Sequence, residues 1–162
     1  MHAPTNSGTK LCLFALPALA LSFAVTSASA AQKPAGQTQL AQKIVNDAHS
    51  KHPEAAEIGV ATIGANGCST IASSDKSDLG EKCEKEDSEP ITSGKPYVEK
   101  EGANFDVTLP LHDSSGKLVG SVGIELKPSP GQSQADVVQQ AQKIASEMEA
   151  SIPSKASLTR PF

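Results

Sequence analysis

A hairpin between Asn104 and Leu126 constrains the fold of this chain more than any other segment. Apolar residues recur at every second position along most of both arms: Phe105, Val107, Leu109 and Leu111, then Leu118, Val122, Ile124 and Leu126. A period of two is typical of strands with one face on a core. In the polar turn between the arms, Asp113 can accept backbone N–H groups and Gly116 can adopt a left-handed conformation. The segment therefore predicts an antiparallel hairpin in a half-buried sheet.

Residues 1–30 have the pattern of a secretory signal peptide. Lys10 precedes an apolar run, and Ala28-Ser29-Ala30 supplies the small residues of a cleavage site. The run is interrupted by Pro17 and is shorter than the ~20 apolar residues of a spanning helix. An uncleaved membrane anchor is the alternative. We expect cleavage near Ala30 and a periplasmic or secreted product with no integral membrane segment.

The chain without this leader is acidic. Removing Lys10 from the 14 basic residues leaves 13 against 18 acidic ones, a net charge of about −5. Nucleic acids and anionic membranes are bound by clustered Lys and Arg side chains, so we expect neither as a partner. The length fits one domain.

Two cysteines remain after cleavage, Cys68 and Cys83. In an oxidising compartment, a pair of cysteines is expected to form a disulfide. A loop of this size would stabilise the fold by ~3 kcal/mol on the chain-entropy account. Free thiols and metal ligation are the alternatives.

The remaining patterns predict an α+β fold with an antiparallel five-stranded sheet, flanked by an N-terminal and a C-terminal helix, with a long loop after the second strand. The helices are predicted from about Thr38 to His52 and from Gln134 to Ser151, because apolar residues recur there at helical spacing. The strands before the hairpin are predicted over 58–64, 68–73 and 96–100. The expected divisions are a signal peptide (1–30), a leader (31–37), the domain (38–127), a linker and helix (128–153) and a flexible tail (154–162).

Several short segments occur in an order that resembles the Cache family of extracytoplasmic sensor domains, whose fold is related to PAS domains. The matching segments are Ile63-Gly64-Ala65-Asn66-Gly67, Thr70-Ile71-Ala72-Ser73-Ser74-Asp75, Leu79-Gly80, Thr92-Ser93-Gly94-Lys95-Pro96-Tyr97, and Leu109-Pro110-Leu111-His112-Asp113-Ser114-Ser115-Gly116-Lys117-Leu118-Val119-Gly120. The likeness covers about Thr38 to Leu126. Most Cache domains sit between transmembrane helices and feed a kinase or chemoreceptor module. We expect neither in this chain after cleavage, so a membrane-bound receptor or kinase is the expected partner.

The resemblance implies a pocket for a small molecule on one sheet face, covered by the long loop. Carried over by position, the ligand-binding candidates are Ser73, Ser74, Asp75, Tyr97, Glu99 and Phe105. Tyr97 and Glu99 face the same side of a strand and could hold an amine or hydroxyl group. Phe105 could form an apolar wall. The alternative is that Tyr97 is a core aromatic residue and Glu99 an exposed one.

Other chemistry has little support in the sequence. His49 and His52 stand three apart and could share a metal with Glu54, but such a pair is more often part of a helix surface. No nucleophile elbow or phosphate-binding loop is present, so we expect neither catalysis nor a cofactor. The leading hypothesis is an exported module that binds a small polar metabolite for sensing. The alternative is a structural protein of the same fold with no ligand, pairing with itself or with a membrane receptor.

Overall fold

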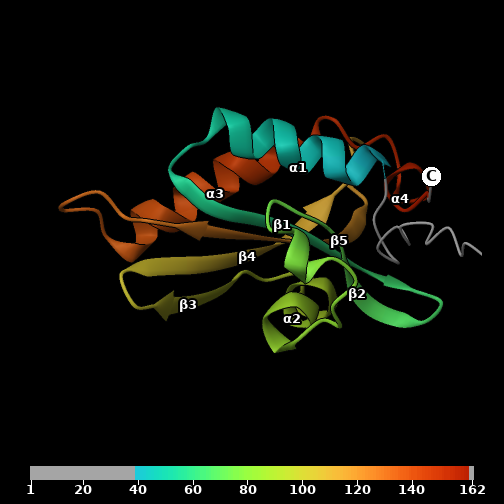
Figure 1. Ribbon diagram of the computed structural model, residues 1–162, viewed down its shortest axis with the longest axis horizontal. Coiled ribbons are helices and arrows are strands. Elements are labelled where there is room, and N and C mark those ends of the chain that lie inside the picture. The colour runs from blue at the N-terminus through green and yellow to red at the C-terminus, as the bar shows by residue number, and fades with distance from the viewer. Residues whose placement is uncertain (1–38, 161–162) are drawn as a thin grey trace, which may run out of the picture. The chain divides into compact units, whose positions relative to one another are not determined.

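The computed structural model describes residues 39–160 (Figure 1), so the predicted signal peptide and leader lie outside the described residues. The strands are β1 (Ala55–Gly64), β2 (Gly67–Ser73), β3 (Tyr97–Glu101), β4 (Asn104–His112) and β5 (Leu118–Leu126). The helices are α1 (Gln39–Lys51), the 3-10 turn η1 (Lys76–Asp78), α2 (Lys85–Ser93), α3 (Gln134–Glu149) and α4 (Lys155–Leu158). Every strand pairing is antiparallel, in the order β2-β1-β5-β4-β3. The predicted α+β fold with a five-stranded antiparallel sheet is confirmed.

The hairpin predicted from sequence is formed by β4 and β5. In its turn, the Asp113 carboxylate accepts the backbone N–H groups of Ser115 at 3.0 Å and Lys117 at 3.1 Å. Gly116 has a φ of 81°, which is the left-handed conformation that glycine adopts without strain. The turn fixes the register in which Thr108 pairs with Gly123.

Helices α1 and α3 cover one face of the sheet (Figure 1). Ser133 caps α3 in a capping box with Asp136, and the helix buries Val137, Ala141, Ile144, Ala145 and Met148. These side chains form one continuous core with apolar residues of the strands, among them Ile58, Val107, Leu109, Val122 and Ile124. The helical periodicity seen in the sequence therefore marks the sheet-facing stripe of α3.

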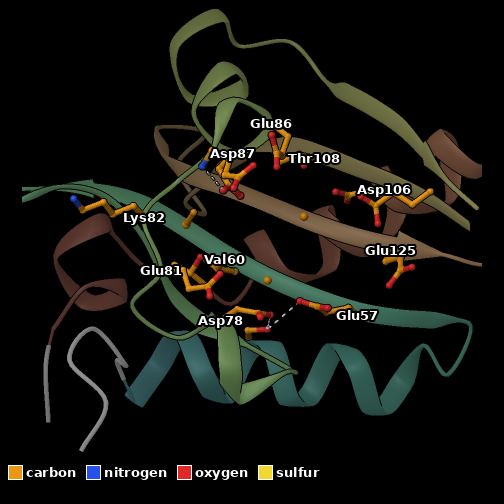
Figure 2. Close-up of a pocket in the computed structure, with 17 residues that line it drawn as sticks. Glu57, Val60, Asp78, Glu81, Lys82, Glu86, Asp87, Asp106, Thr108 and Glu125 are labelled. Atoms are coloured by element: carbon orange, nitrogen blue, oxygen red, sulfur yellow. Dashed lines mark hydrogen bonds between the residues drawn. The ribbon is translucent and has the colours of Figure 1, made fainter.

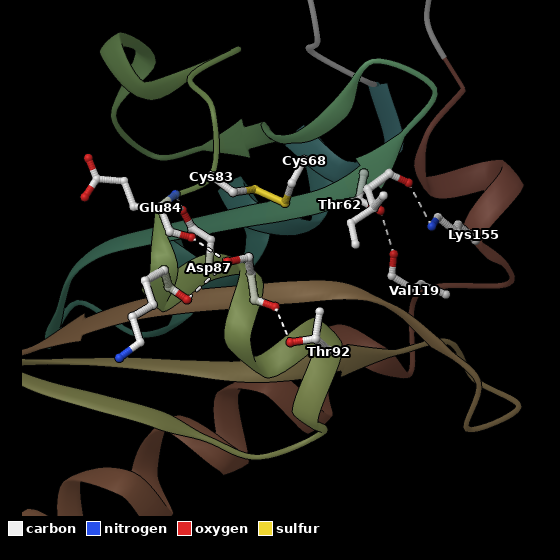
Figure 3. The surroundings of a disulfide bond; sticks show 11 residues. Thr62, Cys68, Cys83, Glu84, Asp87, Thr92, Val119 and Lys155 are labelled. Atoms are coloured by element: carbon white, nitrogen blue, oxygen red, sulfur yellow. Dashed lines mark hydrogen bonds between the residues drawn. A yellow bond between two sulfur atoms is a disulfide. The ribbon is translucent and has the colours of Figure 1, made fainter.

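The segment that holds η1 and α2 lies against the opposite face of the sheet. A disulfide joins Cys68 in β2 to Cys83, just before α2 (Figure 3). Backbone N–H groups donate across the same junction, from Thr70 to the carbonyl of Glu81 and from Gly80 to that of Thr70, both at 2.9 Å. The predicted disulfide is confirmed, and it attaches the polar segment to the edge strand β2.

Strands β1 and β5 approach closely at Gly120. A Cβ atom built there would lie 2.2 Å from the carbonyl oxygen of Ala61, so only glycine fits. Nearby, the Thr62 hydroxyl donates to the carbonyl of Val119 at 2.7 Å (Figure 3). Gly120 therefore allows the close approach of the two strands.

The C-terminal segment differs from the predicted flexible tail. Ser154 caps the short helix α4, Leu158 is fully buried in the core, and the Lys155 ammonium donates to the carbonyl of Ile63 at 3.0 Å (Figure 3). Burial of Leu158 and capping by Ser154 therefore give a defined structure to a C-terminal segment that is mostly polar in sequence. Within residues 39–160, no helix combines the length and the apolar character needed to cross a bilayer.

Candidate functional site

A cavity of about 240 Å³ lies between the sheet and the η1–α2 segment (Figure 2). Nine of the residues that line it are acidic and one, Lys82, is basic. Strands contribute Glu57, Asp106 and Glu125, while the η1–α2 segment contributes carboxylates such as Asp78 and Asp87 (Figure 2). The cavity is therefore strongly electronegative.

The strand carboxylates form a row across the sheet. Glu57 of β1 pairs with Glu125 of β5, which pairs with Asp106 of β4, and Asp106 pairs with Glu99 of β3. Residues paired in register project from the same face, so these four side chains share the face opposite the main helices. The first three line the cavity, and we call Glu57, Glu125 and Asp106 the carboxylate row.

A second row of small residues runs beside the first and forms the cavity floor. In register it contains Ser73, Gly59, Gly123, Thr108 and, at the edge, Tyr97. A Cβ atom at Gly59 would meet nothing within 4 Å, so that position opens onto free space. A Cβ atom at Gly123 would lie 3.7 Å from the Thr108 hydroxyl oxygen and 3.9 Å from a carboxylate oxygen of Asp106. These two oxygens therefore converge above the glycine floor.

Two polar groups on this face lack partners. Thr108 is 1 % exposed, and within the described residues its hydroxyl makes no hydrogen bond. Ser121, on the same face two residues before Gly123, is fully buried and its hydroxyl also has no partner there. A buried hydroxyl without a partner costs about 1–3 kcal/mol, which applies to the Ser121 oxygen, whereas the Thr108 oxygen keeps contact with the cavity. The Thr108 hydroxyl is thus available to a bound molecule.

Two carboxylates of the cavity, Asp106 and Glu57, have pKa values raised above the ordinary range. Burial, reinforced by repulsion from Glu101 and Asp87, raises the pKa of Asp106 to about 6. Burial and the neighbouring carboxyl of Asp78 raise the pKa of Glu57 to about 7. The Ser73 hydroxyl lies between that pair, 3.3 Å from a Glu57 oxygen and 3.1 Å from an Asp78 oxygen. Burial and neighbouring negative charge thus disfavour the ionised forms of these two carboxyl groups, and a nearby cation would favour them.

The residues proposed from the family resemblance are placed in three different ways. Ser73 lines the cavity. Ser74 and Asp75 have local roles, since the Ser74 hydroxyl accepts the Ile58 N–H at 3.0 Å and the Asp75 carboxylate accepts the Ser77 N–H at 2.9 Å.

The remaining three candidates lie outside the cavity lining. The Tyr97 hydroxyl donates to Glu99 at 3.2 Å, so these side chains share one face as expected, at the edge strand β3. Phe105 packs against the helix-covered core, with the Lys100 ammonium 5.9 Å from its ring centre. Its parity with Val107 places it on the face opposite Asp106.

Sequence reasoning missed the carboxylate row and Thr108. Asp106, Thr108 and Glu125 were visible as the polar partners in the alternating hairpin, but they looked like solvent-facing positions. His52, considered for a metal, instead lies 3.3 Å from Glu54 and 3.1 Å from Glu147. Across residues 39–160, no three His, Cys, Asp or Glu side chains form a group that could hold a metal ion.

None of the protein-family models matches this chain, and neither does any curated protein sequence. Among solved structures, the repressor BlcR of Agobacterium tumefaciens is similar over 70% of this chain and 67% of its own, with 8% identity and a TM-score of 0.53. The GAF domain of a two-component sensor histidine kinase from Bacillus halodurans matches over 68% of this chain and 91% of its own, with 14% identity and a TM-score of 0.49. The periplasmic domain of RsbU from Chlamydia trachomatis matches over 56% and 36%, with 17% identity and a TM-score of 0.41.

At these identities the likeness is one of fold alone. An open antiparallel five-stranded sheet, with two long helices on one face and a short helical segment over the other, is the arrangement of PAS and GAF-like domains. The chain therefore has an α+β fold that is consistent with a PAS/GAF-like domain.

Proposed function

We propose that this protein is an exported, Cache-like sensor domain that binds a small, positively charged metabolite without transforming it. The observation that carries the proposal is the convergence of the unpartnered Thr108 hydroxyl and the Asp106 carboxylate above a glycine floor. A pocket with a few converging polar groups is the usual form of a small-molecule site. The two glycines keep that site open.

A positive charge on the ligand follows from the lining. Nine carboxylates against one ammonium would repel an anion and would leave a neutral molecule without a charged counterpart. Burial raises the pKa of Asp106 and Glu57, and repulsion from neighbouring carboxylates adds to it; a cation offsets that repulsion and forms charge-assisted hydrogen bonds with both groups. Thr108 can accept a further N–H from the same ligand.

Signalling would pass through the η1–α2 segment. This segment forms one wall of the cavity and is attached to β2 by the disulfide, so a ligand in the cavity contacts it directly. Export rests on the leader pattern in residues 1–30. A membrane-bound receptor or kinase would then bind the η1–α2 segment differently in the ligand-bound and the ligand-free protein.

A thermal-shift screen of the purified protein tests the binding proposal. Cationic, anionic and neutral metabolites of similar size are compared at equal concentration. A ligand selective for the native state adds about 2.7 kcal/mol at a hundredfold excess over Kd, and the melting temperature rises accordingly. The proposal expects the rise with cations. Flat curves for every cation, or a rise with anions alone, would overturn it.

Export has a separate test. N-terminal sequencing of protein recovered from outside the inner membrane is expected to begin near Ala31. Recovery of the intact N-terminus in the cytoplasmic fraction would refute export and would leave the binding proposal standing.

A further inference from the structure

We propose that the ligand is a linear diamine or polyamine, extended across the strands along the carboxylate row of Glu57, Glu125 and Asp106. This inference rests on the proposed function and specifies its ligand class. It depends on three features: the regular spacing of the row, the shape of the floor beside it, and the scarcity of positive charge in the lining.

The spacing of the row is set by the sheet. Glu57, Glu125 and Asp106 occupy three adjacent strands in direct register. Neighbouring strands lie about 4.8 Å apart, so the outer two Cα positions are separated by about 10 Å. In a linear polyamine, three or four methylene groups separate neighbouring nitrogen atoms by a distance similar to the spacing between strands. A linear chain with two or more ammonium groups can therefore place each charge near a different carboxylate, which a compact single charge cannot do.

The floor beside the row suits the chain between the charges. Gly59 and Gly123 present no side chain, and the space above Gly59 is open for at least 4 Å around a Cβ position. Methylene groups can lie on this bare backbone. An ammonium has three N–H donors, and Thr108 supplies an uncharged acceptor beside Asp106. The Thr108 hydroxyl, which has no partner within the described residues, thus acquires one when the ligand binds.

The lining disfavours ligands that carry their own carboxylate. An amino acid would need a positive partner for that group, and Lys82 is the one basic residue among those that line the cavity. Lys82 forms an isolated β-bridge with Ser69 of the edge strand β2. Its side chain lies away from the carboxylate row (Figure 2). An uncapped diamine avoids this conflict.

Isothermal titration of the unmodified protein with four probes tests the inference without any variant. Putrescine, spermidine, butylamine and calcium chloride are compared in one buffer at low salt, because exposed charge interactions are screened at high ionic strength. We expect putrescine or spermidine to bind at least tenfold more tightly than butylamine. Equal affinity for butylamine and putrescine would overturn the diamine inference and leave a cation site in place. Calcium binding that displaces the amines would overturn it in favour of a metal site. No binding of any probe, with anionic metabolites bound instead, would overturn the proposed function as well.

Matched variants locate the second charge. Asp106→Asn and Glu57→Gln sit at opposite ends of the row, and each is expected to reduce the putrescine-to-butylamine affinity ratio from at least tenfold toward one. Asp47→Asn removes the same charge from the exposed face of α1, where Asp47 pairs with Lys43, and is expected to leave the ratio unchanged. An equal loss in the Asp47 variant would mean that net charge, and not the row, sets the preference.

Discussion

The two faces of the same sheet are built from neighbouring residues and have opposite properties. Val107 and Ile124 seal one face against α1 and α3, while Thr108 and Gly123, one position away on each strand, line the cavity on the other. The helix-covered face is aliphatic, and the core between it and the helices is built from apolar side chains. The cavity face keeps carboxylates in crowded positions and hydroxyls without partners in the described part of the chain. Because side chains alternate along a strand, stability and binding can be assigned to different residues of one hairpin.

This division implies that the cavity face is a source of local instability. Buried like charges and an unsatisfied hydroxyl both favour unfolding. The aliphatic face and the disulfide offset that cost. Substitutions on the two faces are therefore expected to differ in what they affect.

The largest difference is expected between Ile124→Ala and Thr108→Val. Ile124 is fully buried, so its truncation should lower the free energy of unfolding by about 2–5 kcal/mol. Thr108→Val removes an unpartnered hydroxyl and should change that free energy by no more than about 1 kcal/mol, while weakening cation binding. Urea denaturation measures both. A loss of several kcal/mol for Thr108→Val would show that its hydroxyl is structural.

Loss of the disulfide is expected to affect both stability and binding. The Cys68→Ser/Cys83→Ser double variant should lose about 3 kcal/mol, since the bridge closes a loop of 15 residues. The freed segment forms a cavity wall, so ligand affinity should fall too. Denaturation and titration of the variant, compared with the oxidised wild-type protein and with the reduced one as a control, check this. A variant with full stability but weakened binding would show that the disulfide positions the cavity wall without stabilising the fold.

A smaller contrast separates two glycines. Gly120→Ala places a methyl group against the Ala61 carbonyl oxygen and should cost about 1–3 kcal/mol of unfolding free energy, because the strands must move apart. Gly59→Ala adds the same methyl group to open space and should be tolerated. Thermal denaturation of both variants is the measurement. Equal costs would contradict an open cavity above Gly59.

The smallest effect is a pH dependence carried by Glu57. Its pKa is raised to about 7 in the folded protein, so between about pH 4.5 and 7 the folded state binds more protons than the unfolded state. Stability contributed by this group therefore falls as pH rises through that range. Glu57→Gln removes the charge and should stabilise the protein at pH 8, by roughly 1 kcal/mol after allowance for solvent screening at a half-exposed site. At pH 4 the variant and the wild type should be equally stable, and a gain at both pH values would point to packing instead.

Local patterns were sufficient for the five strands and for α1 and α3, but not for α2, which lies in the predicted long loop, or for α4, which lies in the predicted tail. The period-two hairpin, the helical stripe of α3 and the pairing of Cys68 with Cys83 all follow from residues close in sequence or from the only two cysteines left after the leader. Phe105 also had an informative pattern, since its parity with Val107 already assigned it to the core face. Its proposed role as a pocket wall conflicted with that alternation.

The carboxylate row could not be predicted in the same way. Glu57 comes to lie beside Glu125 because β5 inserts between β1 and β4, a pairing between residues 68 positions apart. The η1–α2 segment then covers these residues and turns polar strand positions into a cavity lining. Neither the strand order nor this cover is encoded in local periodicity.

The ligand is proposed to bind on the polar face of the sheet and not among the helices. Methyl NMR of the protein titrated with putrescine tests it directly, because Thr108 and Ala61 carry methyl groups at the cavity while Leu109 and Val122 carry theirs in the helix-covered core. We expect saturable shifts of the Thr108 and Ala61 methyl signals with much smaller shifts at Leu109 and Val122. Shifts confined to the core methyl groups, or none at any of the four at saturating amine, would contradict it.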